Sequence, residues 1–161
     1  MRIVTTLIKD LVTDPANTRR HGERNLETIK ASLLRFGQQK PIVVDAAGVV
    51  VAGNGTLEAA RALGWKKIAI VRTGLEGANR AAYGIADNRT AELAEWDDTA
   101  LAEMLAELKA DGVPGYTDDE IEELITEAID PSFGAVGEDT QGRLDEKTKV
   151  RCPECGHEFT T

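Results

Sequence analysis

The fold is decided by the stretch Val49-Val50-Val51-Ala52-Gly53-Asn54-Gly55-Thr56-Leu57-Glu58-Ala59-Ala60. Its β-branched start predicts a strand, and its second half predicts a helix that ends at Gly64. A strand that enters a helix through glycines leaves free backbone N–H groups at the positive end of the helix dipole, where an anion is favoured. We therefore predict a phosphate site, made of Gly53, Asn54, Gly55 and Thr56. The plain alternative is a tight connection in which Asn54 or Thr56 only caps the helix.

Strand and helix patterns continue on both sides of this stretch. Residues 41–44 predict a strand that pairs with residues 49–52 as a hairpin. An apolar stripe with spacings of three and four predicts a helix from an N-cap at Asn25 to Gly37. Further strands are predicted at 1–12 and 67–71, and further helices at 75–92, 98–111 and 117–130. The order predicts an α/β fold with a helical C-terminal extension.

Two other segments carry arginine beside asparagine. Pro15-Ala16-Asn17-Thr18-Arg19 precedes the first helix, and Ala86-Asp87-Asn88-Arg89 lies in a later one. The planar guanidinium fork suits phosphate oxygens, so we expect Arg19, Asn88 and Arg89 to face the glycine turn. Taken alone, each segment is more often a surface salt bridge than a phosphate site.

The order of these motifs resembles that of the ParB/sulfiredoxin-like domain over residues 7–95. The matching features are the P-x-N-x-R loop, Phe36-Gly37 with the following Gln39-Lys40-Pro41, the A-G-x-G-x-x-E-A-A turn, Leu63-Gly64 and Asp87-Asn88-Arg89. The resemblance implies an α/β (α+β) fold, a small mixed sheet with helices. It also implies that the turn binds nucleotide phosphates or DNA. Members include CTP-dependent segregation clamps, nucleases, small-molecule kinases and sulfinic acid reductases.

The turn departs from the family pattern at several positions. Segregation proteins of the family carry G-E-R-R where this chain has Gly53-Asn54-Gly55-Thr56. No cysteine lies in the turn, which argues against sulfiredoxin-type chemistry because that reaction needs a thiolate. The resemblance still implies a nucleoside triphosphate, CTP or ATP with Mg²⁺, as a cofactor. The variant turn is similar to ParB-like domains of phages and mobile elements, which often accompany DNA-modifying methyltransferases.

Catalysis is a second hypothesis. Metal-dependent nucleases and phosphotransferases need carboxylates for a divalent ion and basic groups for developing charge. Glu58 and Asp87 are the candidate carboxylates, with Arg19 and Arg89 as clamps. Glu58 lies in the first turn of a helix, where the dipole favours a carboxylate for structural reasons as well. The sequence alone leaves open whether the protein is an enzyme.

Charge is divided unevenly along the 161 residues, whose net charge is −9. Residues 1–72 carry 12 Lys and Arg against 6 Asp and Glu, whereas residues 99–161 carry 5 against 16. The basic part favours DNA or nucleotide binding, and the acidic part is expected to repel DNA or to cover the basic part of its own chain. A third hypothesis makes the acidic helices an interaction module that binds a DNA-modifying enzyme.

The C-terminal run Cys152-Pro153-Glu154-Cys155-Gly156-His157 has the C-P-x-C-G form of a zinc knuckle. Structural Zn²⁺ needs four ligands, and Cys152, Cys155 and His157 supply three at most. Two chains sharing one site in a homodimer, a site closed within one chain, and a knuckle that binds no metal remain open.

The sequence predicts four parts. They are the ParB/sulfiredoxin-like domain at 1–95, the helical extension at 96–130, a flexible linker at 131–149 and the zinc-knuckle tail at 150–161. The first residues lack the apolar core of a signal peptide, and no run is long and apolar enough for a membrane span, so we expect a cytoplasmic protein.

Overall fold

The computed structural model describes residues 2–129, 149–151 and 154–160, and a five-stranded mixed sheet lies at the centre of the first range. The strands are β1 (Ile3–Leu7), β2 (Val12–Thr13), β3 (Ile42–Val44), β4 (Val49–Ala52) and β5 (Lys67–Arg72). They lie in the order β1-β5-β3-β4-β2. The pairs β1–β5 and β3–β4 are antiparallel, whereas β3–β5 and β2–β4 are parallel. This mixed sheet confirms the predicted fold class.

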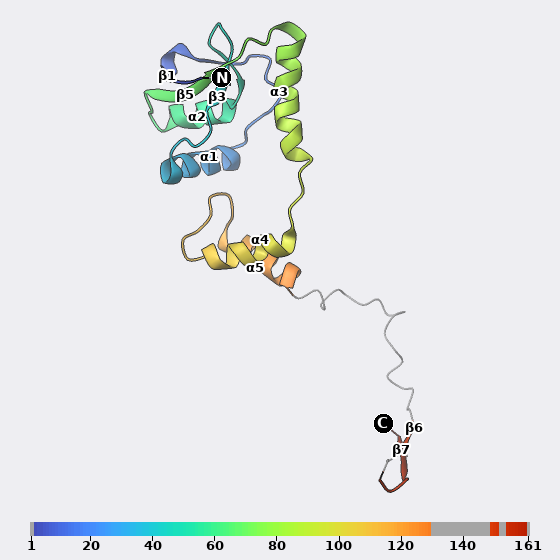
Figure 1. Ribbon diagram of the computed structural model, residues 1–161. Helices are drawn as coiled ribbons and strands as arrows, with labels where there is room; N and C mark the ends of the chain where they lie inside the picture. Colours follow the sequence, from blue (N-terminus) through green and yellow to red (C-terminus); the bar gives the residue numbers. More distant parts are fainter. Residues whose placement is uncertain (1, 130–148, 152–153, 161) are drawn as a thin grey trace.

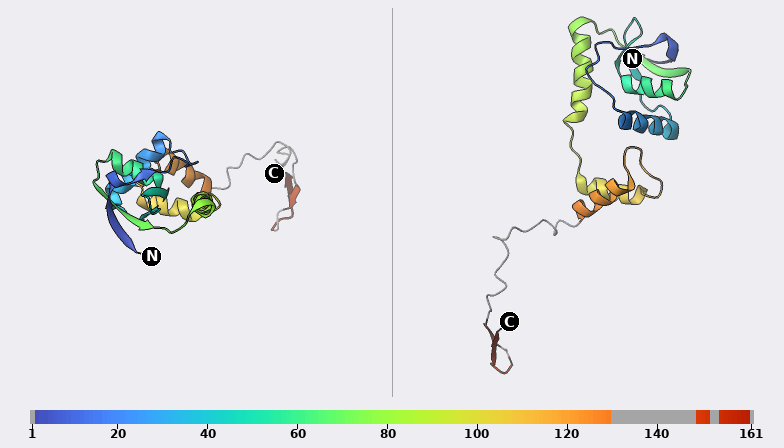
Figure 2. Two further views of the ribbon diagram at one scale, coloured as in Figure 1. Left: turned by 90° about the horizontal axis from the view of Figure 1, so that it is seen from above. Right: turned by 180° about the vertical axis from the view of Figure 1, so that it is seen from behind.

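In the view of Figure 1, helices lie below this sheet and to the right of it, and two more lie further away. They are α1 (Glu23–Phe36), α2 (Asn54–Ala62), α3 (Gly77–Glu92), α4 (Asp98–Leu108) and α5 (Asp118–Ile129). Helices α1 and α2 pack together on one side of the sheet, and α3 contacts β4. Helices α4 and α5 pack on each other and lie beyond α1, away from the sheet (Figure 2).

The core lies between the central strands and α2. Val44, Val50 and Ile70 of the sheet have no exposed surface, and neither has Leu57 of α2. These four side chains belong to one buried cluster, which Leu33 of α1 joins. Burial on this scale holds the β4–α2 connection rigidly, since close-packed apolar side chains resist displacement. The predicted phosphate turn is therefore built on the most buried part of the fold.

The hairpin and the strand at 67–71 are confirmed, but the first predicted strand is wrong. The described residues of this range form β1, a 3₁₀ turn at Ile8–Asp10 and the start of β2. Ile8 and Leu11 are both buried, and two side chains three residues apart cannot face the same side of a continuous strand. The chain therefore turns at Ile8, and β1 and β2 become the two edges of the sheet.

Four helix starts also differ from the prediction, and one of them is that of α3, which begins at Gly77 and not at residue 75. Helix α1 begins at Glu23 after Gly22, not after an N-cap at Asn25, and α2 has Gly53 as its N-cap, not Asn54. Asp97 caps α4 through a bond from the Ala100 N–H, one residue earlier than expected. The predicted capping box at the start of α5 is confirmed, because the backbone N–H of Thr117 donates to Glu120 and that of Glu120 donates to Thr117.

The loop between α4 and α5 contacts α1. Arg24 donates to Glu120 at 2.5 Å and to the carbonyl of Gly115 at 3.2 Å. Arg35 donates to the carbonyls of Asp111, at 3.0 Å, and Gly112. Two arginines of the basic part thus hold the acidic extension. The segment 93–97, which joins α3 to α4, is exposed and contains Trp96.

Near the C-terminus, β6 (Lys149–Arg151) and β7 (Glu158–Thr160) pair as an antiparallel hairpin. Cys155 and His157 are exposed in the connection, while Cys152 lies outside the described residues. The predicted linker at 131–149 also falls almost entirely outside them, and the division into four parts stays a prediction. Among the described residues, no helix has the length and apolar character that a membrane span requires.

Candidate functional site

The glycine turn lies directly over β3. Gly53 has φ +94°, a left-handed conformation, and a Cβ placed there would lie 2.6 Å from Cγ2 of the buried Ile42. Only glycine fits both the backbone conformation and the space. The turn thus brings the first residues of α2 against the sheet, with the helix N-terminus at the end of β4.

Asn54 joins the turn to the arginine loop. The residue is 8% exposed, its Oδ1 accepts the N–H of Asp14 at 3.1 Å, and its Nδ2 donates to the carbonyl of Val50 at 3.3 Å. A buried amide with both ends bonded holds two segments in a fixed relation. The start of the loop at residues 14–19 is thereby tied to the turn.

Asn17 shapes the loop around Arg19. Its Oδ1 accepts the N–H of Arg19 at 3.2 Å, and its Nδ2 donates to the carbonyl of the same residue at 2.9 Å. A side chain that bonds its own backbone two residues on is a common way to fix a turn. The P-x-N-x-R spacing thus serves to hold Arg19 in place.

A cavity of about 160 Å³ brings together most of the predicted site residues. Arg19 lines it from the loop, the turn from Gly53 to Thr56 lines it from α2, and Asp87 and Asn88 line it from α3. Helix α3 reaches this place because it approaches β4 closely at Gly84, where a Cβ would lie 3.2 Å from the Val51 carbonyl oxygen. Asn88 donates back to the Gly84 carbonyl at 2.8 Å.

Two predicted residues lie elsewhere. Arg89 lines an adjoining cavity of about 410 Å³, which shares Arg19 and Asn88 with the first. Glu58 is exposed on α2 and lines neither cavity. Of the two candidate carboxylates, Asp87 alone faces the glycine turn. It also accepts a long bond of 3.5 Å from the hydroxyl of Tyr83. Burial, and then the charge of Asp87, raise the pKa of that hydroxyl.

His21 is a site residue that the motifs missed. It lines the turn cavity, and a Cβ on Gly55 would lie 2.7 Å from its Cε1. The imidazole therefore lies flat against the backbone of the turn, which requires glycine at position 55. His21 Nδ1 is 2.8 Å from Asn25 Oδ1 on α1. The second glycine of the turn is the signal that a close neighbour was needed there.

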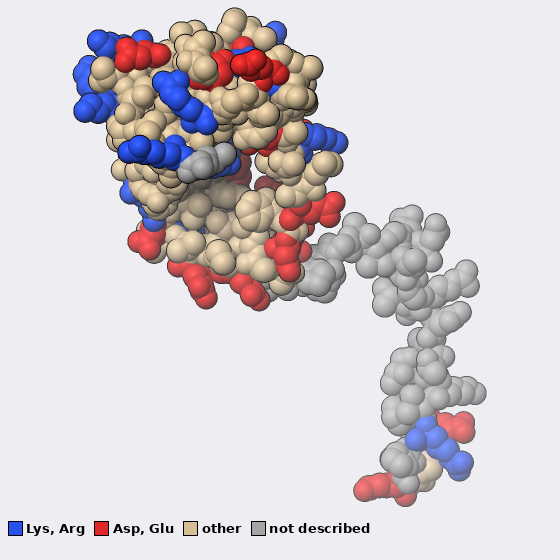
Figure 3. All heavy atoms as spheres, turned by 45° about the horizontal axis from the view of Figure 1, so that its top comes forward, with Lys and Arg blue, Asp and Glu red and all other residues tan. Residues whose placement is uncertain are grey.

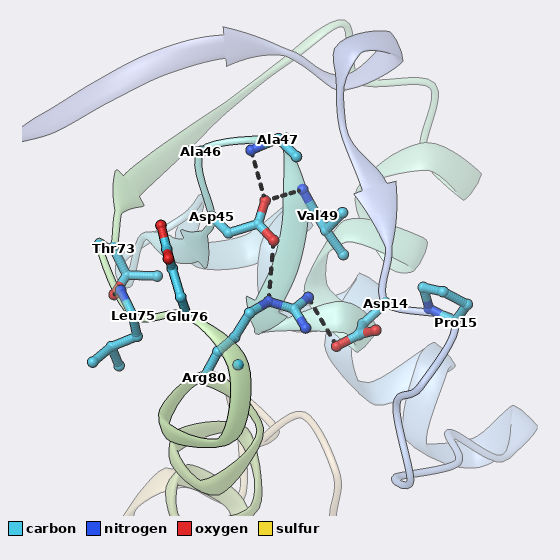
Figure 4. Close-up of a pocket in the computed structure, with 12 residues that line it drawn as sticks. Asp14, Pro15, Asp45, Ala46, Ala47, Val49, Thr73, Leu75, Glu76 and Arg80 are labelled. Atoms are coloured by element: carbon cyan, nitrogen blue, oxygen red, sulfur yellow. Dashed lines mark hydrogen bonds and ion pairs between the residues drawn. The ribbon is translucent and has the colours of Figure 1, made fainter.

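Arg80 holds α3 against the sheet beside a second, larger cavity of about 450 Å³ (Figure 4). Its Nη2 lies 3.0 Å from Asp14 and its Nε 3.0 Å from Asp45, in the turn between β3 and β4. The Nε contact is an ion pair and not an aligned hydrogen bond. Asp14, at the start of the loop, thus contacts both Arg80 of α3 and Asn54 of the glycine turn. This one residue therefore joins the loop, the turn and α3, which line the site.

The face drawn in Figure 3 carries both kinds of charge, with Asp and Glu along its lower edge. The charges that line the adjoining cavity are also mixed. Arg19, Arg20 and Arg89 line the adjoining cavity with one carboxylate, Glu92, which pairs with Arg19 at 2.6 Å and Arg89 at 3.2 Å. Within the described residues, no group of three or more His, Cys, Asp or Glu side chains is placed to hold a metal ion.

The fold is that of ParB-like α/β domains. A solved structure of the C-terminally truncated chromosome-partitioning protein ParB from Caulobacter crescentus, complexed with CTP-gamma-S, matches with a TM-score of 0.60 and 24% sequence identity. The match covers 80% of this chain and 71% of that one, which confirms the expected fold.

Two further solved structures match with lower scores. The Caulobacter crescentus ParB complexed to the centromeric parS site gives a TM-score of 0.46 at 26% identity, covering 76% of this chain and 64% of that one. Sulfiredoxin from Arabidopsis thaliana gives 0.41 at 21%, covering 45% and 85%. The sequence matches no protein-family model and no curated protein.

Proposed function

We propose that this chain binds the phosphate groups of a nucleotide between the glycine turn and Arg19. The observation that carries the proposal is the shared cavity, lined by Arg19, by the start of α2 and by Asn88. The N-terminus of α2 offers backbone N–H groups and the positive end of its dipole, and Arg19 adds a fork of donors. Phosphate is the anion for which these two features are best suited.

The residues present also fit Mg²⁺ beside such a ligand. Asp87 and Asn88 supply one carboxylate and one amide oxygen on the same wall. Mg²⁺ in nucleotide sites takes one or two protein oxygens and completes its shell with phosphate and water. The bound metal would neutralise phosphate charge, while Arg19 and the turn hold the phosphates in place.

Nucleotide titration tests this proposal. The ParB structure that matches the fold holds CTP-gamma-S, so CTP is the first nucleotide to test, with ATP beside it. Arg19→Ala is expected to weaken binding by roughly tenfold or more, because a charge-assisted pair is lost. Arg2→Ala, which removes an exposed arginine before β1, is the matched control. Equal affinity of the two variants would contradict the proposal.

The second candidate is a metal-dependent nuclease or phosphotransferase on the same fold. It is supported by Asp87 at the turn cavity and weakened by the position of Glu58 on an exposed surface. Plasmid nicking and nucleotide turnover with Mg²⁺ or Mn²⁺ separate it from binding. Nucleotide binding without turnover excludes the catalytic candidate, and turnover that survives Asp87→Asn excludes Asp87 as its catalytic carboxylate.

We infer that the macromolecular partner is DNA, because residues 1–72 are basic. We also propose that the protein acts in the DNA metabolism of a phage or mobile element, in the cytoplasm. Direct phosphate contacts predict that DNA affinity falls with salt by roughly one log unit per log unit of salt for each contact. A flat salt response would favour the acidic helices as an interaction module for a DNA-modifying enzyme.

The C-terminal tail is proposed to bind Zn²⁺ through Cys152, Cys155 and His157. Cys155 and His157 are exposed, and a shared site would therefore be open to a second chain. Metal content and mass in solution test both the ion and the homodimer. A protein without zinc would exclude both.

A further inference from the structure

Glu92 occupies the place beside Arg19 that an anionic ligand would take. Its Oε1 accepts from Arg19 Nη1 at 2.6 Å, and its Oε2 accepts from Arg89 Nη1 at 3.2 Å. Each carboxylate oxygen thus meets a different guanidinium, as two oxygens of a phosphate group would. The hydrogen bonds from Arg89 and Arg19 hold the pKa of the Glu92 carboxyl below its usual value, so it is ionised at neutral pH.

The two cavities are lined by different members of this group of three side chains. Arg19 lines both the turn cavity and the adjoining one, whereas Arg89 and Glu92 line only the adjoining one. A single phosphate on the turn need not disturb Glu92. A longer phosphate chain that enters the adjoining cavity meets Glu92 and must take its place between the two arginines.

We propose that Glu92 is an internal competitor that lowers the affinity of this site for ligands with a chain of phosphates and leaves the affinity for ligands with one phosphate unchanged. The proposal rests on the proposed function, since it concerns the same phosphate site. All three side chains are about half exposed, and exposed ion pairs are weak, so a polyanion can displace the carboxylate. A ligand with a single phosphate binds at the turn without displacing Glu92, so its affinity does not depend on this carboxylate.

The test compares CTP and CMP on matched variants. Glu92→Gln removes the competing charge and is expected to tighten CTP binding by roughly threefold to tenfold, with CMP affinity unchanged. Glu95→Gln is the control, because it removes the same charge from an exposed residue of the neighbouring segment. It is expected to bind both ligands as the unsubstituted chain does. Isothermal titration gives the six affinities of the three proteins for CTP and CMP, and a melting curve of each variant without ligand checks the fold.

The outcomes separate this inference from the function it rests on. CTP bound by the unsubstituted chain but no tighter by Glu92→Gln would overturn the inference and leave the proposed function standing. Equal tightening of CTP and CMP, or the same tightening in Glu95→Gln, would also overturn it, since a general charge effect would then suffice. If neither protein binds CTP, CMP or inorganic triphosphate, both proposals fail together. A destabilised Glu92→Gln is replaced by Glu92→Asp, whose shorter side chain is expected to tighten CTP binding in the same direction.

Discussion

Gly53 and Gly55 are glycines for different reasons. Gly53 adopts a left-handed φ of +94° over Ile42, whereas Gly55 lies in the helix and is required by the imidazole of His21. The first serves the fold and the second serves the site. Substitutions at the two positions should therefore separate stability from binding.

Gly53→Ala is expected to lower the free energy of unfolding by roughly 2–5 kcal/mol, as left-handed strain adds to overpacking against Ile42. Gly64→Ala is the control, because Gly64 also has a positive φ, +73°, but nothing lies within 4 Å of the added Cβ. It should lose only the strain, roughly 1–2 kcal/mol. Urea unfolding measures both, and equal losses would show that the contact with Ile42 is unimportant.

At this scale the sequence predicts the turn better than its surroundings. The glycine turn and the loop around Arg19 are each predictable, because each belongs to a motif that is complete within a few residues, whereas their meeting is expected only from their shared suitability for phosphate and from the order of the motifs. His21 and Asn54 were harder to place. The role of His21 depends on Gly55, and that of Asn54 depends on Asp14, and neither partner is near in the sequence. Pairings of this kind are fixed by the packing of whole elements.

Among the helices, α3 has the least apolar packing to fix its position. None of its residues is buried, so apolar packing contributes little to its position. Arg80 compensates for this, since it pairs with Asp14 and Asp45 while only 21% of its side chain is exposed. Because α3 carries Asp87 and Asn88, the geometry of the site depends on this ion pair.

Arg80→Met is expected to cost roughly 2–4 kcal/mol, because it leaves two largely buried carboxylates without their partner. The free energy of unfolding of Arg80→Lys should lie between those of the unsubstituted chain and of Arg80→Met, because an ammonium group cannot reach both carboxylates in the same fixed geometry. Urea unfolding gives the free energies, and amide hydrogen exchange along α3 reports its docking. If Arg80→Met were as harmless as Arg2→Met, the ion pair would not be what holds α3.

The types of the elements were predictable, and several of their ends were not. Period and breaker residues predict the strands from 42 to 72 and every helix. The sequence does not predict the break at Ile8, because a continuous strand and a strand interrupted by a 3₁₀ turn can show the same local alternation of apolar and polar residues. The predicted starts of α1, α2, α3 and α4 differ from the observed ones by one to three residues, since several residues before a helix offer equally good starting points.

At the scale of the whole molecule, the basic part of the chain and its acidic part contact each other through an ion pair. Residues 1–72 are basic and residues 99–161 are acidic, and Arg24 of α1 meets Glu120 of α5. The sequence predicts the imbalance, but it does not predict which pair carries it. That choice depends on the short loop at 109–117, which brings α5 back beneath α1.

Acid is expected to loosen this contact between pH 4.5 and pH 2. The bond from Arg24, and then that from the Thr117 backbone, lower the pKa of Glu120 to about 2. A carboxyl whose pKa is lowered by folding stabilises the folded contact above its ordinary pKa near 4.5, and this stabilisation is lost as the pH falls toward 2.

NMR signals of the Arg24 side chain measure the contact across this range. Glu120→Gln should lack the acid transition, whereas Glu123→Gln, an exposed neighbour on α5, should keep it. A transition complete by pH 4.5 in the unsubstituted chain would contradict the assignment.

The exposed segment after Glu92 gives the protein an optical reporter of its own. The chain has two tryptophans: Trp65 is partly buried beside the core, and Trp96 is 71% exposed between α3 and α4. Indole fluorescence depends on contact with water, so the two emit from different environments. A rearrangement at the end of α3 would change the surroundings of Trp96 and leave those of Trp65 as they are. Ligand-driven movement of this joint can therefore be followed in unlabelled protein.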